Sequence, residues 1–340
     1  GEEFFDIIGN VWQWTQTPID GLPGFEVHEV YDDFSTPTFD GQHNLIKGGS
    51  YFSTGNSALK DSRYAFRRHF FQHAGFRYVE GEEPIITTSN PYETDEQVSQ
   101  YIEFHFGSDY HGVPNFAGAC GTLCLEYFAA TTERKQSRRA LDLGCAIGRT
   151  SFELAREFDH VDGIDFSARF VSAATQLKEN DSKRYTIRDE GDLFSFKETS
   201  LAEHGLAETA HKCEFWQGDA CNLSDKFSNY DLVFAGNLID RLYEPEKFVS
   251  RIHELVNEDG LLVITSPYTW LSEFTDQENW IGGYKRDGEN FTTLDGLKEL
   301  LAPHFDLVDE PRDVPFVIRE TARKFQHSVA QMSVWHKRKK

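Results

Sequence analysis

The residues best suited to chemistry lie in one short turn, D-L-G-C-A-I-G, which follows an apolar run and precedes a helical pattern. Gly144 and Gly148 stand four apart, and Asp142 comes two residues before the first of them. A dinucleotide fingerprint would read G-x-G-x-x-G and place a pyrophosphate on the helix N-terminus. A carboxylate at Asp142 would repel a pyrophosphate but could attract an ammonium group, directly or through water. The two glycines would let the backbone approach such a ligand, because no side chain intervenes.

Polar residues also end the next strands of the pattern. Asp165 closes the run G-I-D, where a carboxylate can accept hydrogen bonds from both hydroxyls of a ribose. Asp219 closes the run Q-G-D and can accept from an adenine amino group, and Asn237 follows the fourth strand as a ligand contact or a turn residue. In an open α/β sheet the ligand lies beyond the carboxyl ends of the strands. The pattern therefore predicts one shared edge, and a plain tight turn with an acid that caps a helix or pairs with a lysine is the alternative.

Alternating strands and helices would bring these residues together. Residues 1–80 are rich in aromatic residues and glycine and predict an irregular segment of short strands, and the polar stretch 81–94 predicts a linker. Residues 95–340 predict an α/β fold with a Rossmann-like, seven-stranded, mostly parallel sheet. Two long insertions, Lys183–Ala210 and Thr269–Phe291, are expected to shape a substrate pocket.

The bulk composition excludes several classes of function. The chain has 340 residues, 34 basic and 56 acidic, and its net charge of −22 disfavours nucleic acid and anionic membranes as partners. Its five cysteines form no C-x-x-C pair, and no run approaches the roughly 18 apolar residues of a membrane span. The acidic opening G-E-E-F-F-D-I-I-G-N lacks the pattern of a signal peptide, and we expect it to follow a cut inside a larger protein. We expect reduced thiols in a cytoplasmic protein.

Taken together, the four strand ends resemble the class I S-adenosylmethionine-dependent methyltransferases. In that family a D-x-G-x-G-x-G turn holds the methionine part of the cofactor, and the next two acids hold ribose and adenine. This sequence departs from the pattern at Ala146, where the middle glycine usually stands, and we expect a negative φ there to tolerate the methyl group. The resemblance implies S-adenosylmethionine as cofactor, held by Asp142, Gly144, Cys145, Gly148, Asp165, Phe166, Ser167, Asp219, Ala220 and Asn237. Ser167 could instead cap the following helix.

The first 80 residues carry a second resemblance. The motifs G-N-V-W-Q-W, I-K-G-G-S-Y and G-F-R look like the last part of the formylglycine-generating-enzyme/sulfatase-modifying fold, which is also the C-terminal lobe of the iron-dependent sulfoxide synthases of thiol-histidine biosynthesis. Such a lobe running into a methyltransferase resembles the bifunctional ovothiol-biosynthesis enzymes, in which a 5-histidylcysteine sulfoxide synthase is fused to a 4-mercaptohistidine N1-methyltransferase. The resemblance implies upstream synthase domains on the same polypeptide.

That resemblance implies methyl transfer to the imidazole π-nitrogen of 5-thiohistidine (4-mercaptohistidine), giving ovothiol A and S-adenosylhomocysteine by in-line displacement. Alignment should supply most of the acceleration, and a base would add a modest part. Asp240 and Tyr268 are the candidates for catalysis. Candidates for binding the charged groups of the acceptor are Tyr110, Asn115, Arg241, Tyr243, Trp270 and Arg319. Each has a plain alternative, such as an Arg241–Glu244 ion pair, a core anchor at Trp270, or a solvated Arg319 beside Glu320.

Other functions stay open at this point. The domain could methylate another small amino acid, amine or thiol, or it could bind the cofactor without catalysis as a module tethered to a synthase. A nicotinamide dehydrogenase is disfavoured by the carboxylate at Asp142. His69 and His73 stand four apart, a metal-binding spacing on a helix, but no carboxylate lies beside them. We expect a packed aromatic segment there and no metal.

Overall fold

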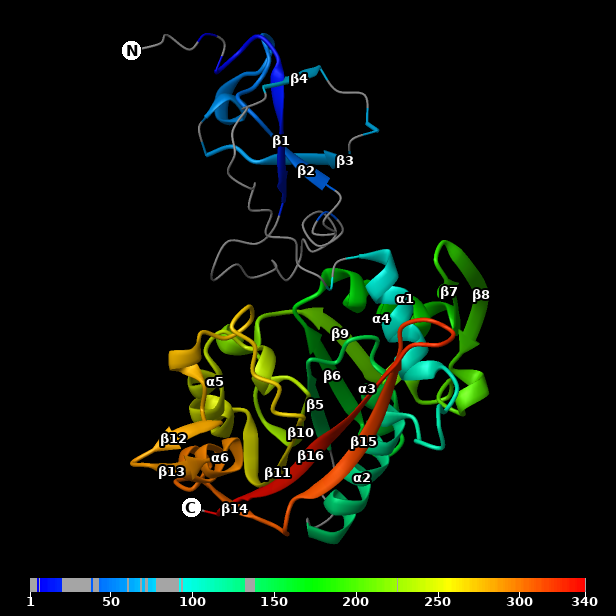
Figure 1. The fold of residues 1–340 in the computed structure, drawn as a ribbon, viewed down its shortest axis with the longest axis vertical. Helices are drawn as coiled ribbons and strands as arrows, with labels where there is room; N and C mark the ends of the chain where they lie inside the picture. The colour runs from blue at the N-terminus through cyan, green and yellow to red at the C-terminus, as the bar shows by residue number, and fades with distance from the viewer. Residues whose placement is uncertain are drawn as a thin grey trace. The chain divides into compact units, whose positions relative to one another are not determined.

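In a computed structural model, the structure describes residues 5, 7–19, 38, 43–59, 61–67, 69–70, 73–77, 92, 94–131, 138–224 and 226–339. The chain divides into two compact units, which are described separately here (Figure 1). The first comprises Gly1–Gln97 with Ser167–Arg169, and the second comprises Val98–Phe166 and Phe170–Lys340. Most of the predicted linker, residues 81–91 and 93, lies outside the described residues.

The first unit contains a small sheet of short strands, as its glycine-rich and aromatic sequence predicts. The strand order is β3-β2-β1-β4, with β1 antiparallel to β2 and parallel to β4. The elements of this unit are β1 (Trp12–Pro18), β2 (His43–Lys47), the 3-10 turn η2 (Gly55–Ala58), β3 (Tyr64–Arg67) and β4 (Ala74–Phe76).

The second unit is built on a central eight-stranded sheet, and the predicted α/β fold with a mostly parallel sheet is confirmed. The order is β14-β16-β11-β10-β5-β6-β9, with β15 paired to β16, so the sheet has one strand more than the predicted seven. The strands are β5 (Arg139–Leu143), β6 (His160–Asp165), β9 (Cys213–Gln217), β10 (Tyr230–Gly236), β11 (Val256–Ser266), β14 (Phe305–Leu307), β15 (Arg312–Arg319) and β16 (Phe325–Lys337).

The five central strands β9, β6, β5, β10 and β11 run parallel, so their carboxyl ends share one edge of the sheet. They are apolar and almost wholly buried, as strands covered on both faces must be. From β5 the chain moves outward through β6 to β9, and then returns to add β10 and β11 on the other side. The strand order therefore reverses between β5 and β10, which is where ligands bind in sheets of this kind.

Helices cover both faces of this sheet because right-handed crossovers in the two directions lie on opposite sides. The helix α6 begins with a capping box, in which the Thr292 hydroxyl accepts from the Asp295 amide and the Asp295 carboxylate accepts from the Thr292 amide. The helices are α1 (Asp95–Phe106), α2 (Phe116–Thr131), α3 (Arg149–Leu154), α4 (Ala168–Asn180), α5 (Pro245–Arg251) and α6 (Thr293–Leu301). None of the helices in the described parts of the chain is both long and apolar enough to cross a bilayer.

The two insertions both form hairpins. The first holds β7 (Ser182–Glu190) and β8 (Leu193–Ser200), and the second holds the turn η9 (Gln277–Asn279) with β12 (Tyr284–Arg286) and β13 (Glu289–Phe291). The remaining 3-10 turns are η4 (Ala202–His204), η5 (Ala210–Lys212), η6 (Ala220–Asn222), η7 (Ile239–Arg241) and η8 (Ile252–Glu254).

The end of the chain forms three strands where two were predicted. The run F-D-L-V-D-E-P-R-D-V divides into β14 and the start of β15, and β15 continues to Arg319. Because β16 pairs with β11 only from Leu261↔His336 to Ser266↔Gln331, the outer half of the β15–β16 hairpin extends past the carboxyl edge toward α1 (Figure 1).

Candidate active site at the carboxyl edge of the sheet

The glycine turn after β5 needs both of its glycines. Gly144 and Gly148 have φ of +73° and +79°, a region that side chains rarely adopt. A Cβ at Gly148 would lie 2.6 Å from the ring of Phe215, and one at Gly144 would lie 3.2 Å from Leu238 Cδ1. The turn thus packs its backbone tightly against β9 and against the end of β10, at the point where the strand order reverses.

The expectation for Ala146 is wrong. Its φ is +45°, so the alanine adopts the left-handed conformation that the usual glycine would supply. This conformation costs alanine about 1–2 kcal/mol because its Cβ crowds the following carbonyl. The turn keeps it because the Ala146 amide donates a hydrogen bond of 2.9 Å to Asp165 Oδ2 on the neighbouring strand.

Asp142 lies behind the turn and not at its surface. It is 1 % exposed, and its Oδ2 accepts a hydrogen bond of 2.6 Å from Ser151 Oγ. The pKa of this carboxyl is raised from 3.8 to about 7, mainly by burial, with the Ser151 hydrogen bond lowering it and the negative charge of Asp165 raising it. Asp142 thus has little surface for a direct ligand contact, and its charge at neutral pH depends on what lies in front of it.

Asp165 ends β6 and is half-buried, with one oxygen engaged by the Ala146 amide. The next residue, Phe166, is 54 % exposed and offers an aromatic ring beside that carboxylate. Ser167 behaves differently, since it is 1 % exposed and its hydroxyl donates to the Tyr92 carbonyl oxygen at 3.2 Å. Asp165 and Phe166 are therefore accessible at the carboxyl edge, whereas the Ser167 side chain is buried.

Asp219 begins the turn η6, as its position after β9 predicts. Its Oδ1 accepts from the Cys221 amide at 2.9 Å, and its Oδ2 accepts from the Tyr243 hydroxyl at 2.7 Å. Burial and the hydrogen bond to Asp219 raise the pKa of the Tyr243 phenol. Tyr243, an acceptor candidate from sequence, thus lies beside the acid predicted to hold adenine, together with Ala220.

Asn237 closes β10 with a φ of +49°. Its backbone N–H donates to the Thr265 carbonyl and hydroxyl oxygens at 2.8 and 3.1 Å, and its side-chain Oδ1 accepts from that hydroxyl at 3.1 Å. Cys145 is 2 % exposed, so only its backbone could meet a ligand at the turn. Burial raises the pKa of its thiol well above the usual value.

Asp240 is misplaced for the role of a base. It is 0 % exposed, and its carboxylate already accepts four hydrogen bonds from three residues. Ser266 Oγ lies 3.0 Å from Oδ1, whereas Oδ2 receives the Thr269 amide at 3.1 Å, the Thr269 hydroxyl at 2.9 Å and Arg241 NH1 at 2.9 Å. A carboxylate enclosed in this way cannot take a proton from a bound acceptor.

Arg241 is committed to the same network. Its guanidinium also donates to the Thr269 carbonyl at 2.9 Å and hydroxyl at 3.1 Å, so it is not a free fork for a substrate carboxylate. The alternative ion pair with Glu244 is also absent from the described contacts, since Glu244 pairs with Lys247 at 3.1 Å.

Tyr268 and Trp270 follow β11 on either side of this network. Tyr268 has a φ of +54°, and its hydroxyl donates to Gln331 Oε1 on β16 at 3.0 Å. The Trp270 indole donates to Thr293 Oγ1 at 2.9 Å and stacks on Trp280 with ring centroids 6.0 Å apart. Trp270 thus packs toward α6, which agrees with the core-anchor alternative, while Tyr268 stays at the sheet edge.

Three further acceptor candidates gather around a buried glutamate of α1. Tyr110, Asn115 and Arg319 line a cavity of about 10 Å³ together with Glu103. This volume holds no more than about one water molecule. The structure therefore brings these residues together, as the prediction of a common binding region requires, but leaves no room among them for an amino acid.

Each of the three has an internal partner. Asn115 Oδ1 accepts from the Gly118 amide at 2.9 Å and so caps α2, and the Tyr110 hydroxyl donates to Glu103 Oε1. Arg319 is not solvated beside Glu320, because its side chain is 7 % exposed and pairs with Asp189 at 2.7 Å on the β7–β8 hairpin. These residues stabilise the packing of α1, α2 and the two hairpins.

Glu103 is the centre of that packing, and it was missed from sequence. Besides Tyr110, it accepts from Tyr185 at 2.6 Å and from Lys197 at 2.8 Å. Burial raises the pKa of Glu103, but these donors outweigh burial and hold the pKa below its usual value. Ser151, the partner of Asp142, was missed as well, although it lies on the first turn of the helix that the glycines introduce.

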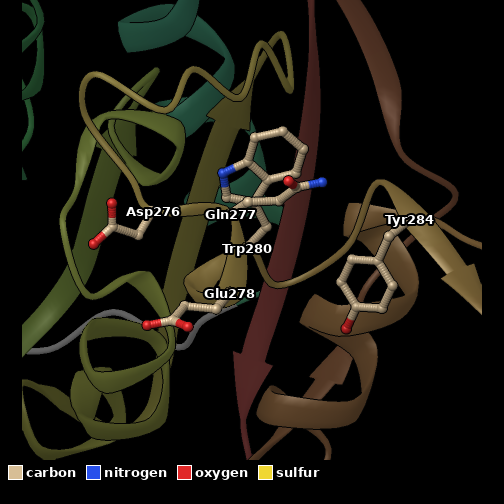
Figure 2. Close-up of a pocket in the computed structure, with 5 residues that line it drawn as sticks. All are labelled: Asp276, Gln277, Glu278, Trp280 and Tyr284. Carbon is tan, nitrogen blue, oxygen red and sulfur yellow. The ribbon is translucent and has the colours of Figure 1, made fainter.

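A larger cavity of about 770 Å³ lies within the second insertion (Figure 2). Its walls are Asp276, Gln277, Glu278, Trp280 and Tyr284, with the two carboxylates on one side of Trp280 and Tyr284 on the other. The insertion thus forms a cavity, but none of the proposed site residues lines it, so a substrate pocket in this insertion stays a prediction.

His69 and His73 do not share a helix, since both lie between β3 and β4 and contact aromatic rings. Within the described ranges, no three histidine, cysteine or acidic side chains gather in a way that could hold a metal ion.

The carboxyl edge fits S-adenosylmethionine. Asp165 and the exposed Phe166 suit a ribose and an adenine, and Asp219 follows the adjacent strand β9. The turn that contains Gly144 and Gly148 lies at this edge, and Gly144 is half-buried, so its backbone can meet the methionine part.

Parts of the chain are similar to known proteins of two kinds. Residues 134–295 match the family described as a methyltransferase domain. One stretch is 36 % identical over 73 residues to ergothioneine biosynthesis protein 1 of Schizosaccharomyces pombe, covering 22 % of this chain and 9 % of that protein. A match to hercynine oxygenase of Mycobacterium tuberculosis is 42 % identical over 45 residues, covering 13 % of this chain and 10 % of that protein. Ajmaline N-methyltransferase of Rauvolfia serpentina is 27 % identical over 145 residues, covering 42 % and 40 %.

The chain thus spans about a tenth of the length of the two ergothioneine-related proteins and less than half of the plant enzyme. It combines a methyltransferase domain, whose cofactor is S-adenosylmethionine, with a segment similar to those two proteins.

Proposed function

We propose that this chain, an S-adenosylmethionine-dependent methyltransferase, transfers a methyl group to the imidazole π-nitrogen of 5-thiohistidine and forms ovothiol A. One observation carries the proposal. A methyltransferase domain and a segment similar to ergothioneine biosynthesis protein 1 and hercynine oxygenase occur in one polypeptide. Ergothioneine and hercynine are histidine derivatives. A histidine derivative is therefore the simplest methyl acceptor for a methyltransferase domain joined to such a segment.

In this proposal the residues over β5, β6 and β9, which form the cofactor half of the carboxyl edge, have separate tasks. Asp165 accepts the ribose hydroxyls, Asp219 binds the adenine amino group, and the turn from Gly144 to Gly148 receives the methionine part. Asp142 acts behind the turn on the ammonium of that part. The cofactor supplies an electrophilic methyl group on a sulfonium.

The remaining task is to align a neutral imidazole nitrogen with that methyl group. Such a nitrogen carries its own lone pair, so alignment contributes more than a base would. This is compatible with an Asp240 carboxylate that is buried and fully hydrogen-bonded. The proposal includes upstream sulfoxide synthase domains of the same polypeptide as the source of 5-thiohistidine, and a cytoplasmic location.

A panel of acceptors tests the proposal. The protein is incubated with S-adenosylmethionine and 5-thiohistidine, histidine, hercynine or an unrelated amine, and the products are located by mass spectrometry and NMR. We expect methylation of the π-nitrogen of 5-thiohistidine and loss of the product in the Asp165→Ala variant. Methylation of another amino acid, amine or thiol in preference to 5-thiohistidine would contradict the proposed acceptor. Cofactor binding without turnover of any acceptor would favour a non-catalytic module.

A further inference from the structure

Three neighbouring strands of the sheet end in a left-handed residue that is not glycine. Ala146 follows β5, Asn237 follows β10 and Tyr268 follows β11, with φ between +45° and +54°. Asparagine tolerates this region, whereas a bulky side chain there is an outlier. All other positive-φ non-glycine residues in the described ranges are asparagine, aspartate or histidine, so Ala146 and Tyr268 stand apart.

The left-handed conformation of Tyr268 is held from both sides. Its own amide donates to Ser266 Oγ at 2.9 Å, and that hydroxyl donates in turn to Asp240 Oδ1 at 3.0 Å. The following residue, Thr269, donates its amide to Asp240 Oδ2 at 3.1 Å. The Asp240 carboxylate thus fixes the residues before and after Tyr268 in place.

Arg241 also contributes to this clamp, because its guanidinium lies 2.9 Å from Asp240 Oδ2. Breaking a buried pair by removing one partner leaves an uncompensated charge, so the clamp is costly to release. Strained residues persist only where the surroundings fix them, and they gather at functional sites.

The Tyr268 side chain lies on the half of the carboxyl edge formed by β10 and β11. The Tyr268 ring is half-buried, and its hydroxyl reaches Gln331 Oε1 on β16 at 3.0 Å. The opposite half of the edge, over β5, β6 and β9, carries the residues assigned to the cofactor. A rigid aromatic face at this place suits a planar acceptor ring.

We propose that Tyr268 positions the acceptor ring against the cofactor half, and that Asp240 is a positioning residue that acts through Tyr268 and Thr269. This inference rests on the proposed methyltransferase function and deepens it. It replaces the role of base that the sequence suggested for Asp240 with a purely geometric one.

The test is a double-mutant cycle made from Asp240→Asn, Tyr268→Gly and the double variant. Glycine adopts the left-handed conformation without strain, so Tyr268→Gly removes the ring and the need for a clamp together. For each single variant we expect kcat/KM for the acceptor to fall about ten-fold or more, chiefly through KM. The double variant should be no worse than Tyr268→Gly, and the affinity for S-adenosylhomocysteine should stay unchanged in all three.

Two additional readouts separate positioning from other roles. The pH dependence of kcat/KM in Asp240→Asn should keep the acidic limb of the unsubstituted protein, whereas loss of that limb would identify a base. Tyr268→Phe keeps the ring and loses only the Gln331 bond, so it should retain near-normal KM. If Asp240→Asn does not fold, Ser266→Ala removes one link of the clamp and should raise KM in the same direction.

Additive losses in the double variant, or a parallel loss of S-adenosylhomocysteine affinity, would overturn the inference. The cycle uses whichever acceptor of the panel the unsubstituted protein methylates. Methylation of a different acceptor with an intact coupling would therefore contradict only the proposed substrate. An unsubstituted protein that methylates nothing would overturn both.

Discussion

The two halves of the carboxyl edge differ in how their polar side chains are used. Over β5, β6 and β9, Asp165 is half-buried beside the exposed Phe166, and Gly144 of the glycine turn is half-buried as well. Over β10 and β11, Asp240 and Arg241 form hydrogen bonds with each other and with the loop that follows β11. The first half presents groups to a ligand, and the second uses its charges to fix backbone.

This difference suits a cofactor that is bound by fixed contacts and an acceptor that must be aligned. A ribose and an adenine are recognised by hydrogen bonds, which need accessible oxygens. Alignment needs rigid walls, and a buried carboxylate with several donors supplies rigidity. The halves can therefore be tested separately, by affinity for cofactor on one side and by KM for the acceptor on the other.

The largest effect is expected at the glycine turn. Gly148→Ala places a Cβ 2.6 Å from the Phe215 ring at a φ of +79°, so the free energy of unfolding should fall by about 3 kcal/mol. Urea unfolding monitored by circular dichroism measures this loss. The matched control is Gly191→Ala, where φ is +53° and nothing lies within 4 Å, and it should cost about 1 kcal/mol. Equal losses in the two variants would show that the turn is not tightly packed.

The next effect concerns the ribose acid. Asp165→Ala should weaken binding of S-adenosylhomocysteine by about 1–3 kcal/mol, because two hydroxyl donors lose their acceptor. Isothermal titration calorimetry measures the affinity, and Asp309→Ala, at an exposed acid far along the sequence, is the control. An unchanged affinity in Asp165→Ala would remove this residue from the cofactor half.

Asp142 should make stability depend on pH. Its pKa is raised by burial to about 7 in the folded protein, so its protonated form contributes stability that is fully present below about pH 4. That contribution is lost as the pH rises through about 7, where the buried carboxyl must ionise. We expect Asp142→Asn to flatten the fall in the free energy of unfolding between about pH 4 and about pH 8. Parallel curves for the variant and the unsubstituted protein would mean that the pKa is not raised.

The smallest effect is expected in the cavity of the second insertion. Glu278 is exposed there and lines no part of the carboxyl edge, so Glu278→Gln should leave both cofactor affinity and acceptor KM within two-fold. Steady-state kinetics measure both quantities. A large rise in acceptor KM would indicate that the acceptor binds in the cavity shown in Figure 2 and not at the edge over β11.

The fold, and the positions of two acids at the ends of neighbouring strands, could be predicted because their signals are local in sequence. Apolar runs of strand length that alternate with amphipathic helices specify a parallel sheet, and the chain itself places Asp165 and Asp219 at strand ends. Even at these strand ends one local expectation was wrong, the negative φ at Ala146. The sequence shows that Ala146 replaces a glycine, but not that the Asp165 carboxylate, 19 residues away, holds it in the left-handed conformation.

The acceptor half could not be predicted because the use of a polar side chain depends on partners far along the chain. The sequence makes Arg319 a candidate for binding the acceptor or, alternatively, a solvated residue beside Glu320, yet it pairs with Asp189, 130 residues away. Tyr243 and Asn115 are likewise engaged by tertiary or capping contacts. Residue type and strand register place a side chain near the site, and only packing decides whether it remains available to a ligand.

The central claim is that the acids at the ends of β5, β6 and β9 bind S-adenosylmethionine while the acceptor lies over β10 and β11. A crystal structure of the protein with S-adenosylhomocysteine and 5-thiohistidine tests it most directly. We expect the ribose hydroxyls on Asp165, the adenine beside Asp219 and Phe166, and the imidazole ring against Tyr268. Ligand density elsewhere, with these side chains making only the contacts described here, would contradict it.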